Sequence, residues 1–387
     1  MEKTLAQLIE ISNTVGRDKT LVVGTGGNTS VKTDDGRYMY IKASGTALKD
    51  MNGRLGWRRL KTESVYEIFE DKSLAKMGIT KREFEIVNRL QATCDDDIKS
   101  GARPSVESLL HVVLDKYIIH LHALPVLVYA CAKNGEKQFL KLFRNERFQP
   151  LWIPYADPGF SLSKKVFRMV NSYFKQYGTR PAIMVLEKHG LLVADNTEDG
   201  VIKLVHKVIK YCNRGLEKTE LSEAYPLGTN EIDSIRKAIK KALLKAAGQN
   251  TPVNYFTNQT VASFAARKDA KKLLAIPALT PDEMGFVSSP IIWLEKYDYK
   301  TIADKIKAGT AKGQKPPTVF FVKDAGLFIV ADKKILPVLT EVIAGSLFVR
   351  SNARNLGGIN PLNRRQRDFI NNWEGEKFRV RLASGRK

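Results

Sequence analysis

The chain has 387 residues, of which 43% are hydrophobic and 27% charged. This composition is typical of a globular protein with one large or two ordinary hydrophobic cores. The sequence contains no run of 18 or more apolar residues and no basic-then-apolar leader, so we expect no membrane partner and a cytoplasmic location. Three widely spaced cysteines, Cys94, Cys131 and Cys212, are expected to be free thiols in a reducing compartment.

The charge balance is strongly basic, with 63 Lys and Arg against 41 Asp and Glu and a formal net charge of +22. Nucleic-acid-binding proteins often have such a balance, because cations neutralise the phosphates. Here the basic residues recur along helices, as in RKAIKKALLK at 236–245, and no zinc-finger or RNP signature is present. We therefore expect no nucleic-acid partner, and interpret the charge as a solubility trait or an aid in attracting anionic substrates.

The first predicted element is an amphipathic helix over residues 4–16. Residues 21–41 then predict a strand, a glycine-rich turn and a hairpin through Asp35 and Gly36 into a second strand. The glycines at 24–27 are similar to part of a dinucleotide-binding loop, but its third spaced glycine is absent. The loop could still offer backbone N–H groups to an anion, although Gly- and Asn-rich stretches are most often simple turns.

After a charged, helix-leaning segment at 54–100, residues 103–123 form the stretch on which the functional interpretation depends. Apolar residues at helical spacing in 105–114 place Glu107 and His111 on one face. His120 and His122 follow in an apolar run of strand length, and alternation points both imidazoles to one side. The two histidines are candidate metal ligands. Taken alone, the pattern is equally compatible with two buried, hydrogen-bonded histidines.

A catalytic zinc site needs a third protein ligand and an open position. The chain has only five histidines, so few candidates exist. His206 lies within a helical pattern and is expected to be a packed or surface residue. His189 instead interrupts two apolar runs of strand length, and a histidine at such a break can reach a site that a strand-interior residue cannot.

The second half of the chain predicts another α/β unit. A polar segment with Pro and Gly at 217–230 suggests a boundary between residues 1–225 and 226–387. The elements expected after it are a helix at 231–247, a strand at 253–256, an apolar run at 290–294, a helix at 300–311, a hairpin at 318–332, a helix at 335–355 and a basic tail.

Three segments, RPSVESLLH (103–111), HLHA (120–123) and EKHGLLVADNTEDG (187–200), resemble the class II aldolase/adducin family. The likeness is to its sugar-phosphate aldolases, in particular the aldolase half of bifunctional rhamnulose-phosphate aldolase/lactaldehyde dehydrogenases. LTPDEMGF (279–286) and NNWEGEKFRVRL (371–382) extend it over most of the chain. The long relatives carry histidine where this chain has Glu283, and the dehydrogenase half and its dinucleotide fingerprint are absent, so we expect an aldolase-type unit without dehydrogenase activity.

The resemblance implies a three-layer α/β/α class II aldolase-like domain followed by a smaller α/β region. It implies a metal-dependent lyase that cleaves a (deoxy)ketose 1-phosphate, such as rhamnulose 1-phosphate, to dihydroxyacetone phosphate and an aldehyde. The expected small-molecule partner is therefore a sugar phosphate, and the expected assembly is a homo-oligomer, a tetramer. The implied metal is divalent, and three imidazoles favour zinc, held by His120, His122 and His189.

The same resemblance assigns two further sets of residues. Glu107 would be the general acid/base at the donor carbon, and Tyr155 is a conceivable proton donor or a packing residue. From the residues alone, Glu107 could instead be a first-turn helix residue favoured by the macrodipole. We expect His111, four residues further on, either to contact the site residues without binding the metal or to pack in the core. The residues implied for the substrate phosphate are Asn28, Thr29, Ser44, Gly45 and Ser105.

Two alternative functions stay open. Relatives with this fold also perform pentose-phosphate 4-epimerisation and sugar-phosphate dehydration, which use the same metal and carboxylate. Adducin-type members lack the histidine triad and act as interaction modules. The intact set of three histidines favours an enzyme over such a module.

Overall fold

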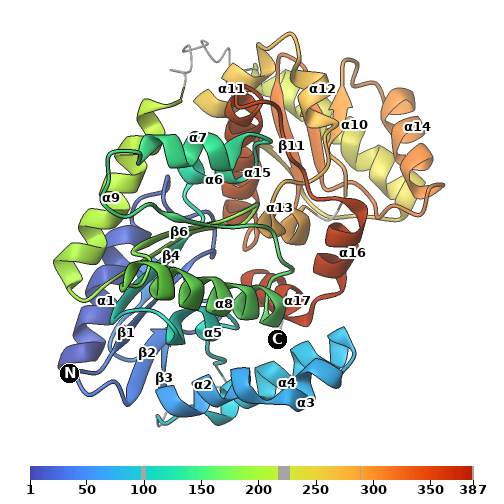
Figure 1. The fold of residues 1–387 in the computed structure, drawn as a ribbon. Helices are drawn as coiled ribbons and strands as arrows, with labels where there is room; N and C mark the ends of the chain where they lie inside the picture. The colour runs from blue at the N-terminus through green and yellow to red at the C-terminus, as the bar shows by residue number, and fades with distance from the viewer. Residues whose placement is uncertain (97–101, 217–226, 288, 386–387) are drawn as a thin grey trace.

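The structure, a computed structural model, describes residues 1–96, 102–216, 227–287 and 289–385 (Figure 1). It contains a seven-stranded sheet and a four-stranded sheet. The expected fold class, a larger α/β region followed by a smaller one, is confirmed. The expected boundary between residues 225 and 226 lies outside the described residues.

The seven-stranded sheet is antiparallel except at one edge, where β5 and β6 run parallel. Its strands in order are β3 (Trp57–Lys61), β2 (Tyr38–Lys42), β1 (Asn28–Lys32), β4 (Tyr117–Leu121), β7 (Gly190–Asp195), β6 (Ile183–Leu186) and β5 (Leu151–Ile153). The hairpin of β1 and β2 is confirmed, whereas the apolar residues 21–23 before it form no strand. In β4, Ile119 packs into the core on one face and Ile118 into the core on the other, so this strand is apolar on both sides.

Helices cover both faces of this sheet and complete three layers. On one face lie α1 (Lys3–Gly16), the 3-10 turn η1 (Leu48–Asp50), α6 (Leu124–Ala130), α7 (Gly135–Leu142) and α9 (Glu198–Arg214). On the other lie α2 (Thr62–Glu70), α3 (Lys72–Lys76), α4 (Ile79–Ala92), α5 (Ser108–Val112) and α8 (Phe160–Tyr177). The helices pack through apolar stripes: α1, for example, buries Leu8, Ile11 and Val15 at helical spacing.

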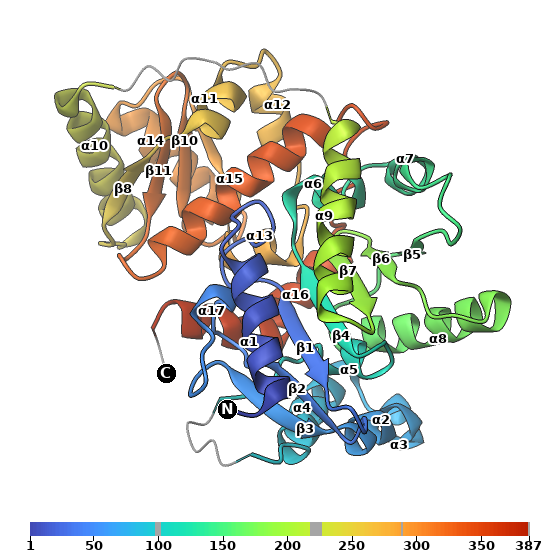
Figure 2. The same cartoon turned by 90° about the vertical axis from the view of Figure 1, so that its left-hand side faces the viewer.

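The four-stranded sheet has the order β8 (Val253–Phe256), β11 (Gly326–Val330), β10 (Val319–Val322) and β9 (Ile292–Leu294). Helices α10 (Thr229–Ala247) and α14 (Tyr299–Thr310) cover one face. The opposite face of this sheet packs against α11 (Gln259–Ala265), α12 (Ala270–Leu274) and α15 (Leu336–Ala353). Helix α15 lies between the two sheets and is apolar around its circumference, so one hydrophobic core runs through both parts (Figure 2).

The residues after α15 differ from the basic tail that the sequence suggested. They form α16 (Arg364–Asn372) and α17 (Glu374–Ala383), which pack against α13 (Pro281–Phe286) (Figure 1). A capping box, in which Asn363 and Gln366 satisfy each other's backbone N–H groups, begins α16. Few apolar residues mark these helices, because much of their packing uses charged side chains. Residues 364–383 are therefore part of the folded structure.

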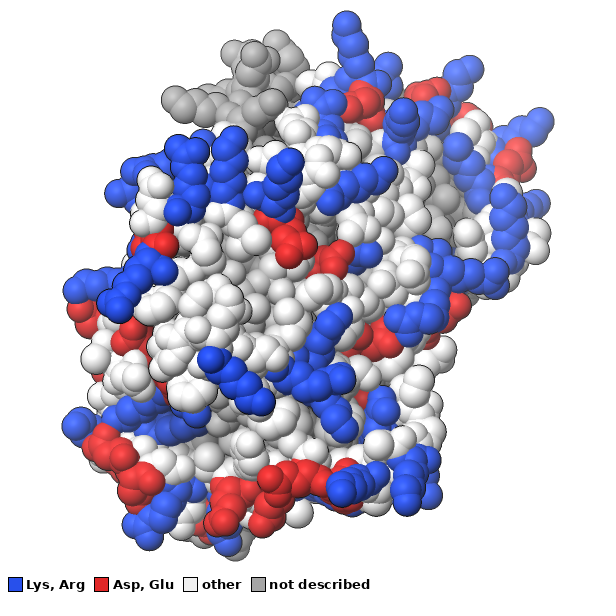
Figure 3. All heavy atoms as spheres, in the orientation of Figure 1, with Lys and Arg blue, Asp and Glu red and all other residues white. Residues whose placement is uncertain are grey.

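Charged side chains are distributed over the surface. On the face drawn in Figure 3, Lys and Arg are spread over both parts of the molecule and interspersed with Asp and Glu. No helix in the described ranges is both long enough and apolar enough to cross a membrane. Cys94, Cys131 and Cys212 are all free thiols, as expected.

Candidate metal centre and substrate pocket

Three histidines converge where β4 and the β6–β7 hairpin meet. His120 lies within β4, His122 directly follows it, and His189 lies in the turn between β6 and β7. Because β4 pairs with β7, with Leu121 opposite Leu191, the ends of the two strands lie at the same edge. One nitrogen from each imidazole lies within 4.8 Å of the others. The structure thus brings together the three predicted ligands.

The turn that carries His189 needs an unusual backbone. Lys188 has a φ of 59°, a left-handed conformation that is uncommon for a residue with a side chain. Its backbone N–H donates to the carbonyl of Ala130 at 2.9 Å, and its Nζ donates to the carbonyl of Pro361 at 2.9 Å. At Gly190, a Cβ would lie 2.4 Å from the carbonyl oxygen of Leu121. Glycine there allows β7 to approach β4 closely enough to place the imidazole at the site.

The donor set fits a divalent metal. Nδ1 of His120 lies 2.9 Å from the carbonyl oxygen of Leu191, which can only accept, so this nitrogen carries the proton. Nδ1 of His122 likewise contacts the carboxylate of Asp282. Both Nε2 atoms then present lone pairs, and they face each other at 3.2 Å. Burial lowers the pKa of His120 to about 3, so it is a neutral imidazole, the form that binds metals. A shared cation would relieve the repulsion between these lone pairs.

Glu107 reaches the triad from the N-terminus of α5. Its Oε1 lies 3.1 Å from Nε2 of His189, and its Oε2 lies 3.5 Å from Nε2 of His120. The amide of Asn28 donates to Oε2 at 2.5 Å, and Oγ of Ser105 accepts from the Glu107 backbone N–H at 3.2 Å. Burial would raise the pKa of this carboxyl, but His120 and His189 outweigh burial and hold the pKa below its ordinary value. The carboxylate is therefore available as a base.

Two of the predicted phosphate residues lie on opposite faces of β1. Asn28 pairs with His120 in the β1–β4 register and faces the pocket. Thr29, the next residue, points to the other face, where its hydroxyl lies 2.6 Å from that of Ser12 in α1. Successive side chains of a strand alternate between faces, so both cannot reach one site. This corrects the sequence prediction: the structure does not place Thr29 at the pocket.

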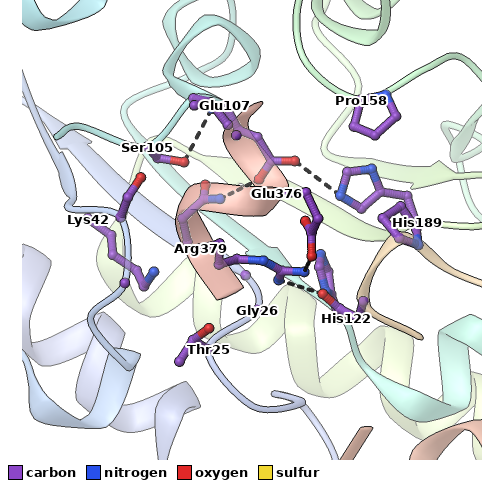
Figure 4. A pocket seen from close by; sticks show the side chains of 18 of the residues that line it. Thr25, Gly26, Lys42, Ser105, Glu107, His122, Pro158, His189, Glu376 and Arg379 are labelled. Atoms are coloured by element: carbon purple, nitrogen blue, oxygen red, sulfur yellow. Dashed lines mark hydrogen bonds and ion pairs between the residues drawn. The ribbon is translucent and has the colours of Figure 1, made fainter. Parts of the chain in front are cut away.

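The other predicted phosphate residues, Ser44, Gly45 and Ser105, all line the pocket. Figure 4 shows Ser105 beside Glu107. An isolated bridge between Ala43 and Pro104 holds their two loops together. Gly45 has a φ of 84°, and a Cβ there would lie 2.5 Å from the Leu382 side chain of α17. Glycine is thus needed both for the turn and for the close approach of the C-terminal helix.

Lys42 is a pocket residue that the sequence interpretation missed. It ends β2, is buried, and lines the pocket. Within the described part of the chain, its Nζ has one weak hydrogen-bond partner, the carbonyl of Ala43 at 3.5 Å. Burial, with a smaller contribution from Arg379, lowers the pKa of Lys42 to about 8, which leaves it mainly cationic at pH 7. Such a cation favours an anionic ligand. Strand alternation beside Ser44 was the signal that could have identified it.

The C-terminal part of the chain supplies a second set of pocket residues absent from the prediction. Asp282 comes from α13, and Glu376 and Arg379 from α17. The Arg379 guanidinium lies 2.5 Å from Asp282 and 2.6 Å from Glu376 (Figure 4). Burial raises the pKa of Glu376; burial would also raise that of Asp282, but Arg379 and His122 keep the Asp282 pKa below its ordinary value. All three lie in the segments 279–286 and 371–382 that extend the family resemblance, which is the signal that could have identified them; their proximity to one another depends on the tertiary fold.

Three residues that the sequence singled out, His111, His206 and Tyr155, are not among the three grouped histidines and do not line the pocket. His111 is buried, and its Nδ1 lies 2.8 Å from the hydroxyl of Ser30, so it is a packing residue. His206 is exposed on α9, as expected. Tyr155 does not line the pocket; its hydroxyl donates to Asp157 at 3.2 Å.

Comparisons with known proteins agree with the resemblance noted in the sequence. The family described as "Class II Aldolase and Adducin N-terminal domain" matches residues 6–216, more than half of the chain. A Bacillus subtilis (strain 168) protein named "Uncharacterized oxidoreductase YuxG" is 25% identical over 424 residues, which cover 99% of this chain and 59% of that protein. The chain thus spans less than two thirds of this relative.

Several solved structures are also similar. An N-terminal class II aldolase domain from Thermoplasma acidophilum is 26% identical, covering 55% of this chain and 94% of that one, with a TM-score of 0.45. YgbL from Klebsiella pneumoniae, a putative aldolase/epimerase/decarboxylase by its own description, is 15% identical over 55% and 88% (TM-score 0.39). The L-fuculose-1-phosphate aldolase from Thermus thermophilus is 14% identical over 54% and 93% (TM-score 0.32). On the strength of the match to residues 6–216, the chain belongs to the class II aldolase and adducin family.

Proposed function

We propose that this protein is a metal-dependent aldolase that cleaves a (deoxy)ketose 1-phosphate, such as rhamnulose 1-phosphate, to dihydroxyacetone phosphate and an aldehyde. One observation carries the proposal. Three imidazole nitrogens within 4.8 Å of one another share a site with the buried carboxylate of Glu107, which lies 3.1 Å from His189. A ligand triad beside a proton-transfer group is what carbon–carbon cleavage next to a carbonyl requires.

His120, His122 and His189 would hold the metal, and zinc suits three imidazole ligands. When bound, a divalent metal supplies Lewis-acid polarisation of the substrate's carbonyl and hydroxyl oxygens and stabilises the negative charge that develops on cleavage. Burial keeps His120 neutral at physiological pH, so its imidazole has a lone pair available to bind the metal.

Glu107 would hold and move the proton. In the cleavage direction, the carbon–carbon bond breaks as the neighbouring hydroxyl loses its proton and becomes the aldehyde carbonyl, and the donor carbon of dihydroxyacetone phosphate gains a proton. In the synthetic direction, the same carbon must lose that proton to a base. The amide of Asn28 donates to one carboxylate oxygen at 2.5 Å and orients the group, while the other oxygen lies 3.1 Å from Nε2 of His189, beside the proposed metal position.

The anion-binding side of the pocket would take the phosphate. Lys42 supplies a buried cation, and Ser44, Gly45 and Ser105 line the same wall. A phosphate held there would accept a hydrogen bond from Nζ of Lys42, whose hydrogen bond to the carbonyl of Ala43 is long, at 3.5 Å. This arrangement separates the charged end of the substrate from the carbon that reacts.

A coupled assay tests the proposal directly. The protein, supplied with Zn²⁺, is incubated with rhamnulose, fuculose or ribulose 1-phosphate, and released dihydroxyacetone phosphate is reduced by a coupling enzyme with NADH. Release from one of the three supports aldolase activity and names the sugar. Bound metal without release from any of them would overturn the aldolase assignment and favour epimerisation or dehydration. Failure to bind metal after reconstitution would favour an interaction module instead.

A further inference from the structure

The metal centre draws on the part of the chain that lies beyond the family-matched domain. We propose that Asp282, in the C-terminal part, is a positioning residue for the metal ligand His122, so that residues 6–216 alone do not make a complete metal centre. The inference rests on the metal centre of the proposed function but not on its substrate. It concerns how one ligand is oriented, and it assigns a role to a region outside the domain match.

The supporting contact joins two buried side chains. Oδ2 of Asp282 is hydrogen-bonded to Nδ1 of His122, and the two side chains are 5% and 6% exposed. An ionised carboxylate only accepts, so the contact assigns the proton to Nδ1 and leaves Nε2 free. The free Nε2 is the atom that faces Nε2 of His120 at 3.2 Å. Asp282 therefore determines which nitrogen of His122 is presented at the metal site.

His122 needs such a partner more than His120 does. His120 lies inside β4, and the carbonyl of Leu191 on the neighbouring strand β7 fixes its ring. His122 lies just beyond the end of β4, and its Nδ1 is hydrogen-bonded to a side chain, that of Asp282, and not to a carbonyl of the neighbouring strand. Carboxylate partners of metal-bound histidines hold the ring orientation and increase the basicity of the ligating nitrogen.

The position of Asp282 is itself fixed by α17. Arg379 contacts Asp282 at 2.5 Å and Glu376 at 2.6 Å, and its own side chain is 17% exposed. Helices α13 and α17 are so close that a Cβ at Gly285 of α13 would lie 1.9 Å from Oε1 of Glu376 in α17. The carboxylate is thus held between the imidazole and the guanidinium, and the C-terminal helix fixes its place.

The neighbouring residue provides a matched control. Glu283 lies on the same helix and is also buried, but its carboxylate accepts from the backbone N–H of Leu279 at 2.8 Å and contacts Arg350 at 2.6 Å. None of these partners is a histidine. Both Glu283→Gln and Asp282→Asn therefore remove one buried charge from α13. Only Asp282→Asn removes a charge that contacts a proposed metal ligand.

The experiment uses the full chain in metal-free form, with circular dichroism to compare folding. Zn²⁺ affinity is measured by competition with a chromophoric chelator, and the Co²⁺-loaded protein is compared by its visible spectrum. Asp282→Asn should weaken Zn²⁺ binding by about 10- to 100-fold and alter the Co²⁺ spectrum. Glu283→Gln should retain the affinity and spectrum of the unaltered protein. Equal affinity and spectrum for Asp282→Asn would overturn the inference.

A measurement on the unaltered protein keeps the test decisive if Asp282→Asn does not fold. In metal-free protein with ¹⁵N-labelled histidine, imidazole NMR reports which nitrogen of each ring is protonated, and His122→Gln assigns the signal. Protonation of His122 at Nδ1 supports the inference, whereas protonation at Nε2 contradicts it. The proposed aldolase activity can fail separately: metal loss in Asp282→Asn without cleavage of any sugar phosphate would reject the substrate and keep the positioning role.

Discussion

The carboxylate of Glu107 lies 3.1 Å from Nε2 of His189, so the proposed proton-transfer group and a proposed metal ligand are in direct contact. Glu107→Gln keeps the size of the side chain and removes its basicity. We expect metal to stay bound and turnover to fall by about 10²- to 10⁴-fold, the usual contribution of a general acid/base. Elemental analysis and the coupled assay, performed on one sample, measure both effects. Glu146→Gln, which alters a surface ion pair with Lys207, is the control; undiminished turnover in Glu107→Gln would make this carboxylate structural.

The histidine triad can be tested one ligand at a time. His120→Ala and His189→Ala each remove one of the three nitrogens grouped within 4.8 Å, so each variant should lose stoichiometric metal. His206→Ala, at an exposed position on α9, should keep it. Metal content after gel filtration, with circular dichroism as a check on folding, is the measurement. Stoichiometric metal in the folded His120 or His189 variant would contradict the ligand assignment.

Replacing Lys42 should affect the binding of the substrate phosphate. Lys42→Met removes a buried cation whose hydrogen bond to an anion is worth about 1.5–3 kcal/mol, so KM for a sugar phosphate should rise by about 10-fold or more. Lys61→Met, at an exposed position on β3, should leave KM unchanged. Steady-state kinetics on the active ketose phosphate provide the comparison. An unchanged KM in Lys42→Met would mean that the phosphate binds elsewhere.

The same lysine predicts a pH dependence. Burial lowers the pKa of Lys42 to about 8, so its cation is present below that pH and is lost as the pH rises through it. Because kcat/KM reports the free enzyme, it should decline above about pH 8. In Lys42→Met this alkaline decline should disappear, although the remaining kcat/KM is lower. The measurement is a pH profile of kcat/KM for both proteins. The same decline at alkaline pH in the variant would assign the decline to another group.

The basic surface should not hold nucleic acid tightly. Lys and Arg on the face drawn in Figure 3 are dispersed, whereas a nucleic-acid site concentrates them. Purification in low and then high salt, with the ratio of absorbance at 260 and 280 nm followed throughout, should release little nucleic acid. A tight, salt-sensitive complex would instead favour a binding module.

The residues around the triad show what sequence patterns can predict. Strand alternation placed His120 and His122 on one side, and the break at His189 indicated a residue that projects from between strands. These are local properties of a short segment, and the structure retains them. The elements of the second region, such as β8 at Val253–Phe256, were predictable from apolar runs for the same reason.

The errors and omissions also have physical causes. Thr29 was placed beside Asn28 at the phosphate, although neighbours in a strand face opposite ways. The roles of Asp282 and Arg379 do not follow from helical or strand periodicity, because the contact of Asp282 with His122 and that of Arg379 with Asp282 form only in the tertiary fold. Helices α16 and α17 looked like a basic tail because ion pairs replace much of the apolar periodicity on which helix prediction depends.

If this site cleaves a sugar phosphate with the help of one metal ion, cleavage must depend on bound metal. The most direct measurement is the release of dihydroxyacetone phosphate by chelator-treated protein as Zn²⁺ is added back in substoichiometric steps. We expect no release from the metal-free protein and a linear recovery that ends at one metal per chain. Full release by demonstrably metal-free protein, or no release at any metal content with any of the ketose 1-phosphates, would contradict it.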